Sequence, residues 1–85
     1  MEYPKQKRIV NKELVAQIMA EQKHCLIEGY GHHFGEECPH HIKSRGSGGG
    51  DVRGNILRVC LRHHQMIHNG LISKEEQRRI VAKYN

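Results

Sequence analysis

Five of the eight histidines lie between residues 38 and 68, around a glycine-rich stretch, and this clustering constrains the fold more than any other feature of the sequence. The segment begins Cys-Pro-His-His-Ile and ends Cys-Leu-Arg-His-His-Gln-Met-Ile-His. His64 and His68 are four residues apart, so a helix would place their imidazoles side by side on one face. Such a pair can bind a single metal ion. The sequence therefore predicts a small fold organised around metal.

A chain of 85 residues makes one small domain, which buries too little apolar surface to be robust without added support. Hydrophobic residues make up 36% of the chain and aromatic residues 5%, which excludes a large core. The three cysteines are an odd number, and this argues against a disulfide framework and for metal ligands in a reducing compartment. We expect a soluble cytoplasmic protein that a metal ion helps to stabilise.

The chain carries a net charge of +5 with a pI near 9.4, which suits a polyanionic partner such as nucleic acid. No stretch is apolar and long enough to span a bilayer, and the polar N-terminal segment lacks the apolar core of a signal peptide. The sequence therefore argues against a membrane protein and against a secreted one.

The N-terminal part is expected to be a flexible basic arm over residues 1–10, followed by a single domain over residues 11–85. Apolar residues recur at helical spacing from Asn11 to about Lys23, and Asn11 can cap this helix. Cys25–Ile27 is a short apolar run that can form a strand, with Cys38–Lys43 as its antiparallel partner. The expected fold class is α+β.

The second half of the chain is expected to hold a glycine-rich loop, residues 44–54, and two helices. The first covers about residues 61–68 and ends at Asn69 and Gly70, because a helix often finishes on a residue in the left-handed region. The second begins at Ser73, which forms a capping box with Glu76.

Three histidines, His40, His64 and His68, can hold one metal ion and leave coordination positions open, as a catalytic site requires. In phosphodiester hydrolysis such an ion stabilises the transition state while a separate base takes a proton from the attacking water. His41 is the natural base, because neighbouring residues on a strand point to opposite faces and cannot easily bind the same ion.

His41, Asn55 and His64 resemble the three name-giving residues of the HNH endonucleases, and the resemblance covers residues 25–70. It implies a β-hairpin followed by a helix around one divalent ion, the ββα-metal fold, with helices added at both ends. By the resemblance His41 is the general base, and His40, His64 and His68 bind the ion. Asn55 braces the loop and orients the base. From the residues alone, Asn55 is equally a helix cap.

A second, structural metal site is predicted from Cys60 and His63, whose spacing fits half of a tetrahedral zinc site. Cys25 and Cys38 are the available thiolates for the other half. Many HNH proteins build this site from two Cys-x-x-Cys pairs, but here position 28 is glutamate, so Cys38 or one of His24, His32 and His33 must substitute. The alternative is that the cysteines are small buried apolar residues.

Five basic residues flank the predicted site and are expected to contact phosphates: Lys43, Arg45, Arg53, Arg58 and Arg62. The expected function is hydrolysis of DNA by a monomer or homodimer. Three imidazoles favour Mn²⁺, Ni²⁺, Co²⁺ or Zn²⁺ by affinity, and Mg²⁺ by abundance. Two alternatives stay open: a non-catalytic zinc module that binds nucleic acid, and a subunit that is active only within a larger phage or restriction assembly.

Overall fold

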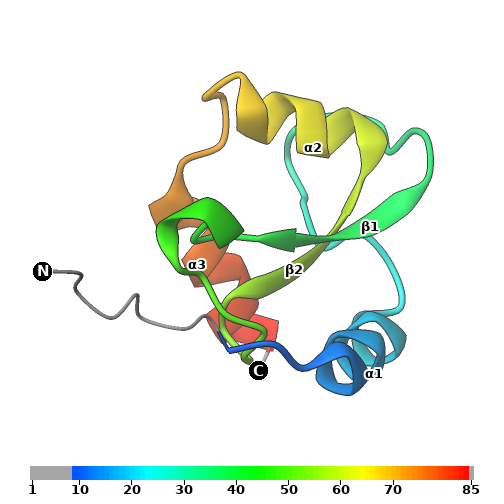
Figure 1. Cartoon of the computed structure of the whole chain (residues 1–85). Helices are drawn as coiled ribbons and strands as arrows, with labels where there is room; N and C mark the ends of the chain where they lie inside the picture. The colour runs from blue at the N-terminus through cyan, green and yellow to red at the C-terminus, as the bar shows by residue number, and fades with distance from the viewer. Residues whose placement is uncertain (1–8, 85) are drawn as a thin grey trace, which may run out of the picture.

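The sheet consists of two antiparallel strands, β1 (Glu37–His41) and β2 (Ile56–Cys60), in a computed structural model that describes residues 9–84 (Figure 1). Glu37 lies opposite Cys60, and His41 lies opposite Ile56. The predicted strand at Cys38–Lys43 is therefore confirmed in part. Its predicted partner is wrong, because Cys25–Ile27 has no strand conformation. The Leu26 amide of this segment donates to the Arg58 carbonyl at 3.1 Å.

Three helices surround the sheet: α1 (Lys12–Gln22), α2 (Leu61–His68) and α3 (Lys74–Tyr84). Asn11 caps α1 as predicted, since its side chain accepts from the Leu14 amide at 3.0 Å. Helix α2 ends where the sequence predicts, with Gly70 in the left-handed region at φ +78°. Only half of the predicted capping box forms on α3: the Glu76 amide donates to Ser73 at 3.1 Å, but the Glu76 carboxylate pairs with Arg79.

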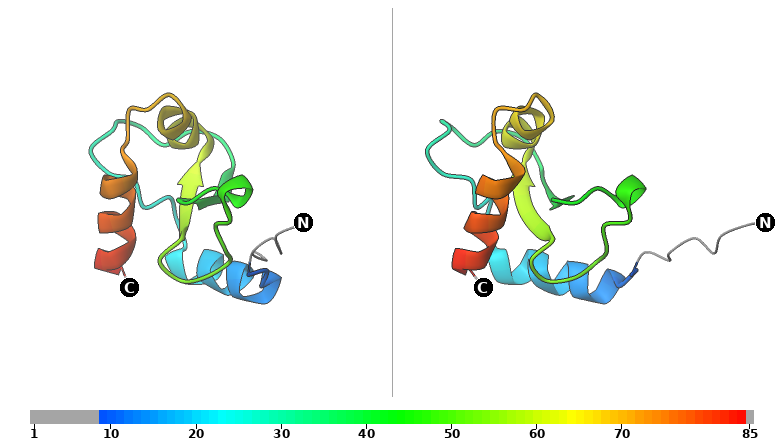
Figure 2. Two further views of the ribbon diagram at one scale, coloured as in Figure 1. Left: turned by 60° about the vertical axis from the view of Figure 1, so that its left-hand side comes forward. Right: turned by 90° about the vertical axis from the view of Figure 1, so that its left-hand side faces the viewer.

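The core lies where β2 meets the helices. Strand β2 runs from the region of α1 directly into α2, and α3 lies alongside (Figure 2). Because β2 contacts all three helices, its four apolar residues are buried on both faces, while Arg58 in the middle is half-buried. The apolar core residues are Cys25, Ile27, Ile42, Leu57, Val59, Cys60, Ile72 and Val81.

The glycine-rich connection between the strands folds back tightly on the end of β1. It contains a short 3₁₀ helix, η1 (Arg45–Ser47), and the Gly49 amide donates to the Ser44 carbonyl at 2.8 Å. A side chain at Gly49 would place its Cβ 1.8 Å from the Lys43 carbonyl oxygen, so only glycine fits there. The order of elements from β1 to α2 is strand, loop, strand, helix, which is compatible with a small ββα fold.

Two further sequence expectations concern the basic arm at the N-terminus and the absence of a membrane-spanning stretch. Most of the predicted basic arm, including Lys5, Lys7 and Arg8, lies outside the described residues. Within residues 9–84, no helix has both the length and the apolar character needed to cross a bilayer.

Candidate metal centres

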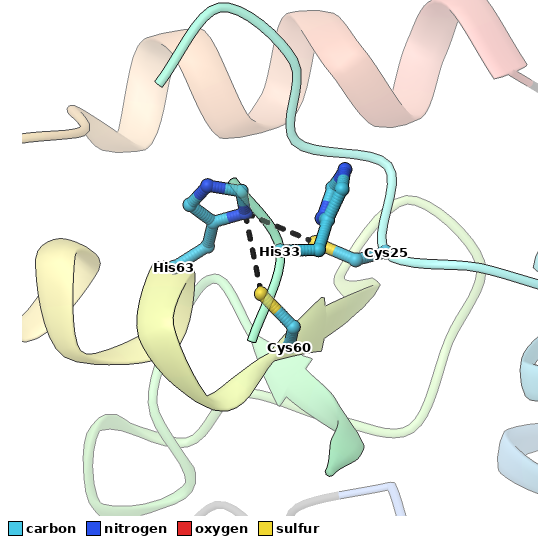
Figure 3. A group of neighbouring side chains, drawn as sticks. All are labelled: Cys25, His33, Cys60 and His63. Atoms are coloured by element: carbon cyan, nitrogen blue, oxygen red, sulfur yellow. Dashed lines mark hydrogen bonds between the residues drawn. The ribbon is translucent and has the colours of Figure 1, made fainter. Parts of the chain in front are cut away.

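Four side chains from three parts of the chain converge beside the start of α2: Cys25, His33, Cys60 and His63 (Figure 3). One ligating atom of each lies within 4.8 Å of one from every other. The His63 Nδ1 is 3.4 Å from the Cys25 Sγ and 3.3 Å from the Cys60 Sγ. These four residues, hereafter the Cys/His cluster, are placed to hold a metal ion.

Local structure explains why the cluster forms. Cys60 is the N-cap of α2 and His63 lies in its first turn, so the helix turns both side chains to the same side. Cys25 follows α1, and its amide donates to the Glu37 carboxylate at 2.9 Å. The loop carrying His33 lies directly against α2, because a Cβ at Gly35 would come 2.5 Å from the Cβ of Leu61.

The electrostatics of the two cluster cysteines differ although both are buried. Burial raises the pKa of Cys25 to about 11, although hydrogen bonds from the backbone of Cys60 and Ile27 oppose the rise. Burial also acts to raise the pKa of Cys60, but hydrogen bonds from the backbone of His63 and Phe34 outweigh it and lower that pKa to about 7. A thiol of lowered pKa gives up its proton easily, and the thiolate is the form that binds metal.

The structure departs from the predicted ligand set at one residue, since His33 takes the place predicted for Cys38. The register explains why. Cys60 pairs with Glu37, so their side chains share one face of the sheet, and Cys38 on the next position points to the other face. The Cys38 Sγ lies instead 3.8 Å from the His64 Nδ1.

A second group of side chains, the three-histidine group His40, His64 and His68, gathers on the face of the sheet that carries Cys38. The ring centroids of His64 and His68 are 4.5 Å apart, and their Nε2 atoms approach to 3.1 Å. The centroid of His40 is 5.2 Å from that of His64 and 6.2 Å from that of His68. The three imidazoles predicted to share an ion therefore lie together.

Gln77 of α3 orients His40. Its Oε1 lies 2.9 Å from the His40 Nε2, and its own Nε2 donates to the Ile72 carbonyl at 3.0 Å. Burial lowers the pKa of His40 to about 4; the bond to Gln77 opposes this, and the neighbouring histidines add to it. Burial and then His68 also lower the pKa of His64. Both imidazoles thus stay neutral, the form that ligates metal.

The lowered pKa of His40 predicts sensitivity to acid. The unfolded chain, with a histidine pKa near 6.5, binds a proton before the folded chain does, so the free energy of unfolding should fall between about pH 6.5 and 4. A shift of this size corresponds to on the order of 3 kcal/mol. Denaturant unfolding across this range should show a flatter pH dependence for His40→Gln than for wild type. Equal slopes in the two proteins would contradict the prediction.

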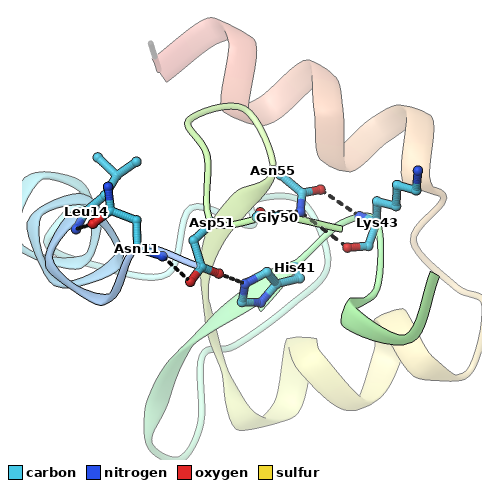
Figure 4. A network of polar contacts seen from close by, with 7 residues as sticks. All are labelled: Asn11, Leu14, His41, Lys43, Gly50, Asp51 and Asn55. Carbon is cyan, nitrogen blue, oxygen red and sulfur yellow. Dashed lines mark hydrogen bonds and ion pairs between the residues drawn. The ribbon is translucent and has the colours of Figure 1, made fainter. Parts of the chain in front are cut away.

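His41 points away from the three-histidine group, as strand alternation predicts, and lies against Asp51 (Figure 4). Its Nε2 is 2.7 Å from the Asp51 Oδ1, and the two residues are 9% and 3% exposed. The other carboxylate oxygen of Asp51 accepts from the Asn11 amide at 2.9 Å. The candidate base is thus held between the sheet and the start of α1.

Asn55 braces the loop rather than capping a helix, because β2 follows it directly. Its Oδ1 accepts from the Lys43 amide at 2.7 Å, and its Nδ2 donates to the Lys43 carbonyl at 3.2 Å and the Gly50 carbonyl at 3.0 Å. These bonds tie the end of β1 to the start of β2, as Figure 4 shows. The described contacts of Asn55 include no bond to His41.

Substitutions at Asn55 should therefore be costly. Asn55→Ala removes three hydrogen bonds and should lower the free energy of unfolding by about 2–4 kcal/mol. Asn55→Asp keeps the acceptor but turns a carboxylate toward two carbonyl oxygens, so we expect at least as large a loss. Urea unfolding measures both. If Asn55→Asp were stable and Asn55→Ala were not, the hydrogen bond from the Lys43 amide would be enough to hold the loop.

Three of the five cations predicted to contact DNA are bonded within the protein: Arg53 to Glu21 at 2.6 Å, Arg58 to Glu37 at 2.6 Å, and Arg62 to the His32 carbonyl at 2.6 Å. The Arg58 guanidinium also donates to the Met19 carbonyl. Lys43 and Arg45 are exposed on the connection that leaves β1.

Sequence reasoning missed two residues of these sites, Asp51 and Gln77, and left a third, His33, open. His33 was one of three histidines that could substitute in the zinc site, and no common ligand spacing joins it to Cys25. Asp51 was only one residue of the glycine-rich loop 44–54. Gln77 carried a readable signal: it is three, four and seven residues before Ile80, Val81 and Tyr84, so it falls on the apolar stripe of α3, where an uncharged polar residue needs a partner.

Comparisons of this chain with known protein families, with curated proteins and with solved structures found no match.

Proposed function

We propose that this protein is a metal-dependent endonuclease that hydrolyses phosphodiester bonds in DNA. The observation that carries the proposal is the gathering of three histidines, His40 from a strand with His64 and His68 from a helix. A fourth histidine, His41, follows His40 on the strand. The resemblance of His41, Asn55 and His64 to the HNH endonucleases supports it, as does the net charge of +5.

The roles of the residues follow from their chemistry. His40, His64 and His68 would hold a divalent ion, which when bound supplies charge stabilisation to the phosphoryl oxygens and the leaving group. Gln77 fixes the ring of His40 in the position seen. His41 accepts the proton of the attacking water, and Asn55 holds the loop that follows His41 in place. The exposed cations Lys43 and Arg45 bind phosphates next to the cut.

The Cys/His cluster is proposed to bind a structural zinc ion. Zinc bound by a thiolate at about 2.3 Å and an imidazole at about 2.0 Å in tetrahedral geometry sets their ligand atoms about 3.5 Å apart. The two sulfur-to-Nδ1 distances at His63, 3.4 and 3.3 Å, fit this spacing. Two cysteines and two histidines are also a common ligand set for zinc that stabilises a fold.

The test of the nuclease proposal is cleavage of supercoiled plasmid with Mg²⁺, Mn²⁺, Ni²⁺ or Zn²⁺ added. We expect nicked or linear product with at least one ion and none in excess chelator. His68→Ala should need a higher concentration of that ion but should keep the metal of the Cys/His cluster, because His68 lies outside that cluster. Cleavage that persists in chelator would overturn the metal dependence.

A second candidate function is favoured by one observation, the burial of His41 against Asp51. A metal-stabilised module that binds nucleic acid without cutting it would use this pair only to hold the loop. That candidate predicts a shift of labelled DNA in a native gel together with intact plasmid under every ion. Shift and cleavage together would reject it.

A further inference from the structure

A carboxylate is built into the fold next to the candidate base. Asp51 follows the three glycines of the connection, and its amide donates to the Ile9 carbonyl at 2.8 Å. Its side chain is 3% exposed, with one oxygen 2.7 Å from the His41 Nε2 and the other 2.9 Å from the Asn11 amide. A buried carboxylate needs donors such as these two, because an unsatisfied charge in the interior is costly.

We propose that Asp51 is the positioning residue of His41: it holds the ring so that Nε2 carries the proton and Nδ1 remains the atom that accepts one. The proposal rests on the proposed nuclease function and deepens it. An ionised carboxylate only accepts hydrogen bonds, so the nitrogen that faces it must be the donor. The opposite nitrogen then has the lone pair, and a fixed tautomer is what a partner on a catalytic histidine supplies.

The chemical step is a displacement at phosphorus with one proton transfer to His41. As the water oxygen bonds to phosphorus, one of its O–H bonds breaks and an Nδ1–H bond forms on His41. The bond from phosphorus to the leaving oxygen breaks at the same centre, and that oxygen departs with the electron pair and takes a proton from solvent water. The ring is then positively charged, and Asp51 stabilises it through Nε2–H. The carboxylate keeps its own charge throughout and takes no proton.

This assignment changes which residue is expected to orient His41. By resemblance, Asn55 both braces the loop and orients the base. In the structure Asn55 bonds to Lys43 and Gly50, and the contact with the His41 ring comes from Asp51. The two roles are therefore carried by two residues.

Two of the donors to Asp51, the Asn11 amide and the His41 ring, make Asp51→Asn a sharp test. Asparagine has one acceptor oxygen where aspartate has two. If that oxygen keeps the bond from the Asn11 amide, the new NH₂ group faces the His41 Nε2 and forces it to become the acceptor. If the oxygen turns to His41 instead, the NH₂ group meets the Asn11 amide, donor against donor. Asp51→Asn should therefore move the proton of His41 to Nδ1 or release the start of α1.

The experiment measures the tautomer of His41 in ¹⁵N-labelled protein by two-bond ¹H–¹⁵N correlation in mildly alkaline buffer, with His41→Ala identifying the resonances. Wild type should carry the proton on Nε2. Asp51→Asn should either lose that tautomer or keep it with the start of α1 released, and in both cases kcat for plasmid cleavage should fall. Where the tautomer is lost, the fall should be about 10²–10⁴-fold, the usual contribution of a general base, with little change in KM. Glu75→Gln, which removes an exposed carboxylate on α3, should change neither.

The outcomes separate the two proposals. A wild-type protein that cuts DNA while His41 carries its proton on Nδ1 overturns the role of Asp51 and leaves the nuclease proposal standing. If the wild-type protein carries the proton on Nε2 but does not cut DNA, the nuclease proposal is overturned while the contact between Asp51 and His41 is supported. The wild-type spectrum decides even if Asp51→Asn does not fold, and an Asp51→Asn protein with unchanged tautomer and unchanged kcat overturns the inference.

Discussion

Cys60→Ser should release the zinc ion proposed for the Cys/His cluster and unfold most of the protein at room temperature. Structural zinc in small domains has an apparent binding free energy of about 10–16 kcal/mol. A domain of this length has a total stability of only about 4–13 kcal/mol, at the usual contribution per residue. Loss of a buried thiolate ligand therefore removes a binding free energy comparable to the whole free energy of unfolding. Metal analysis after mild chelation and circular dichroism would measure both effects.

Cys38→Ser is the matched control, because it makes the same change on the opposite face of the sheet. It should keep the metal content and the melting temperature of wild type. His33→Ala should weaken metal binding less than Cys60→Ser does, because His33 is the exposed member of the set. If Cys38→Ser lost the ion while His33→Ala kept it, the ligand set would be the one predicted from the sequence. A wild-type protein without metal would refute the structural-zinc proposal.

His41→Ala should lower the rate of cleavage by about 10²–10⁴-fold, the amount that a general base contributes. Metal content and DNA affinity should be nearly unchanged, because the ring of His41 is turned to Asp51 rather than to either candidate metal centre. A gel assay of plasmid cleavage, metal analysis and a native gel shift would separate these three properties.

The alanine variant leaves the Asp51 carboxylate buried without its imidazole, which lowers stability as well as activity. His41→Gln answers this problem, since glutamine can still donate to Asp51 but cannot serve as a base near neutral pH. Both variants should be inactive, and the exposed His24→Ala should cut like wild type. Cleavage by His41→Gln at the wild-type rate would contradict the assignment of His41 as the general base.

The parts of the fold that could be predicted from the sequence are those with local signals. Helix α2 was placed correctly because the Asn69-Gly70 pair marks its end, and α1 because Asn11 supplies a cap. The partner of β1 was wrong because a short apolar run such as Cys25–Ile27 reads the same whether it is a strand or a buried irregular segment. Only long-range packing distinguishes the two.

The sites show the same division. The gathering of His40 with α2 followed from alternation on the strand and from helical spacing, both of which are local rules. The fourth residue of the Cys/His cluster depended on the register of the sheet, which turns Cys38 away from Cys60. The contact of Asp51 with His41 depended on how ten residues of glycine-rich chain fold, and spacing alone does not fix that path.

One short helix connects the two candidate metal centres. Neighbouring residues of α2, His63 and His64, contribute to the Cys/His cluster and to the three-histidine group respectively. The helix has eight residues, so a tilt of α2 would move ligands of both centres together. The occupancies of the centres should therefore be thermodynamically linked, and by reciprocity each ion must change the affinity for the other by the same factor. Under the proposed functions, the supply of zinc would then set the sensitivity of the proposed nuclease to its working ion.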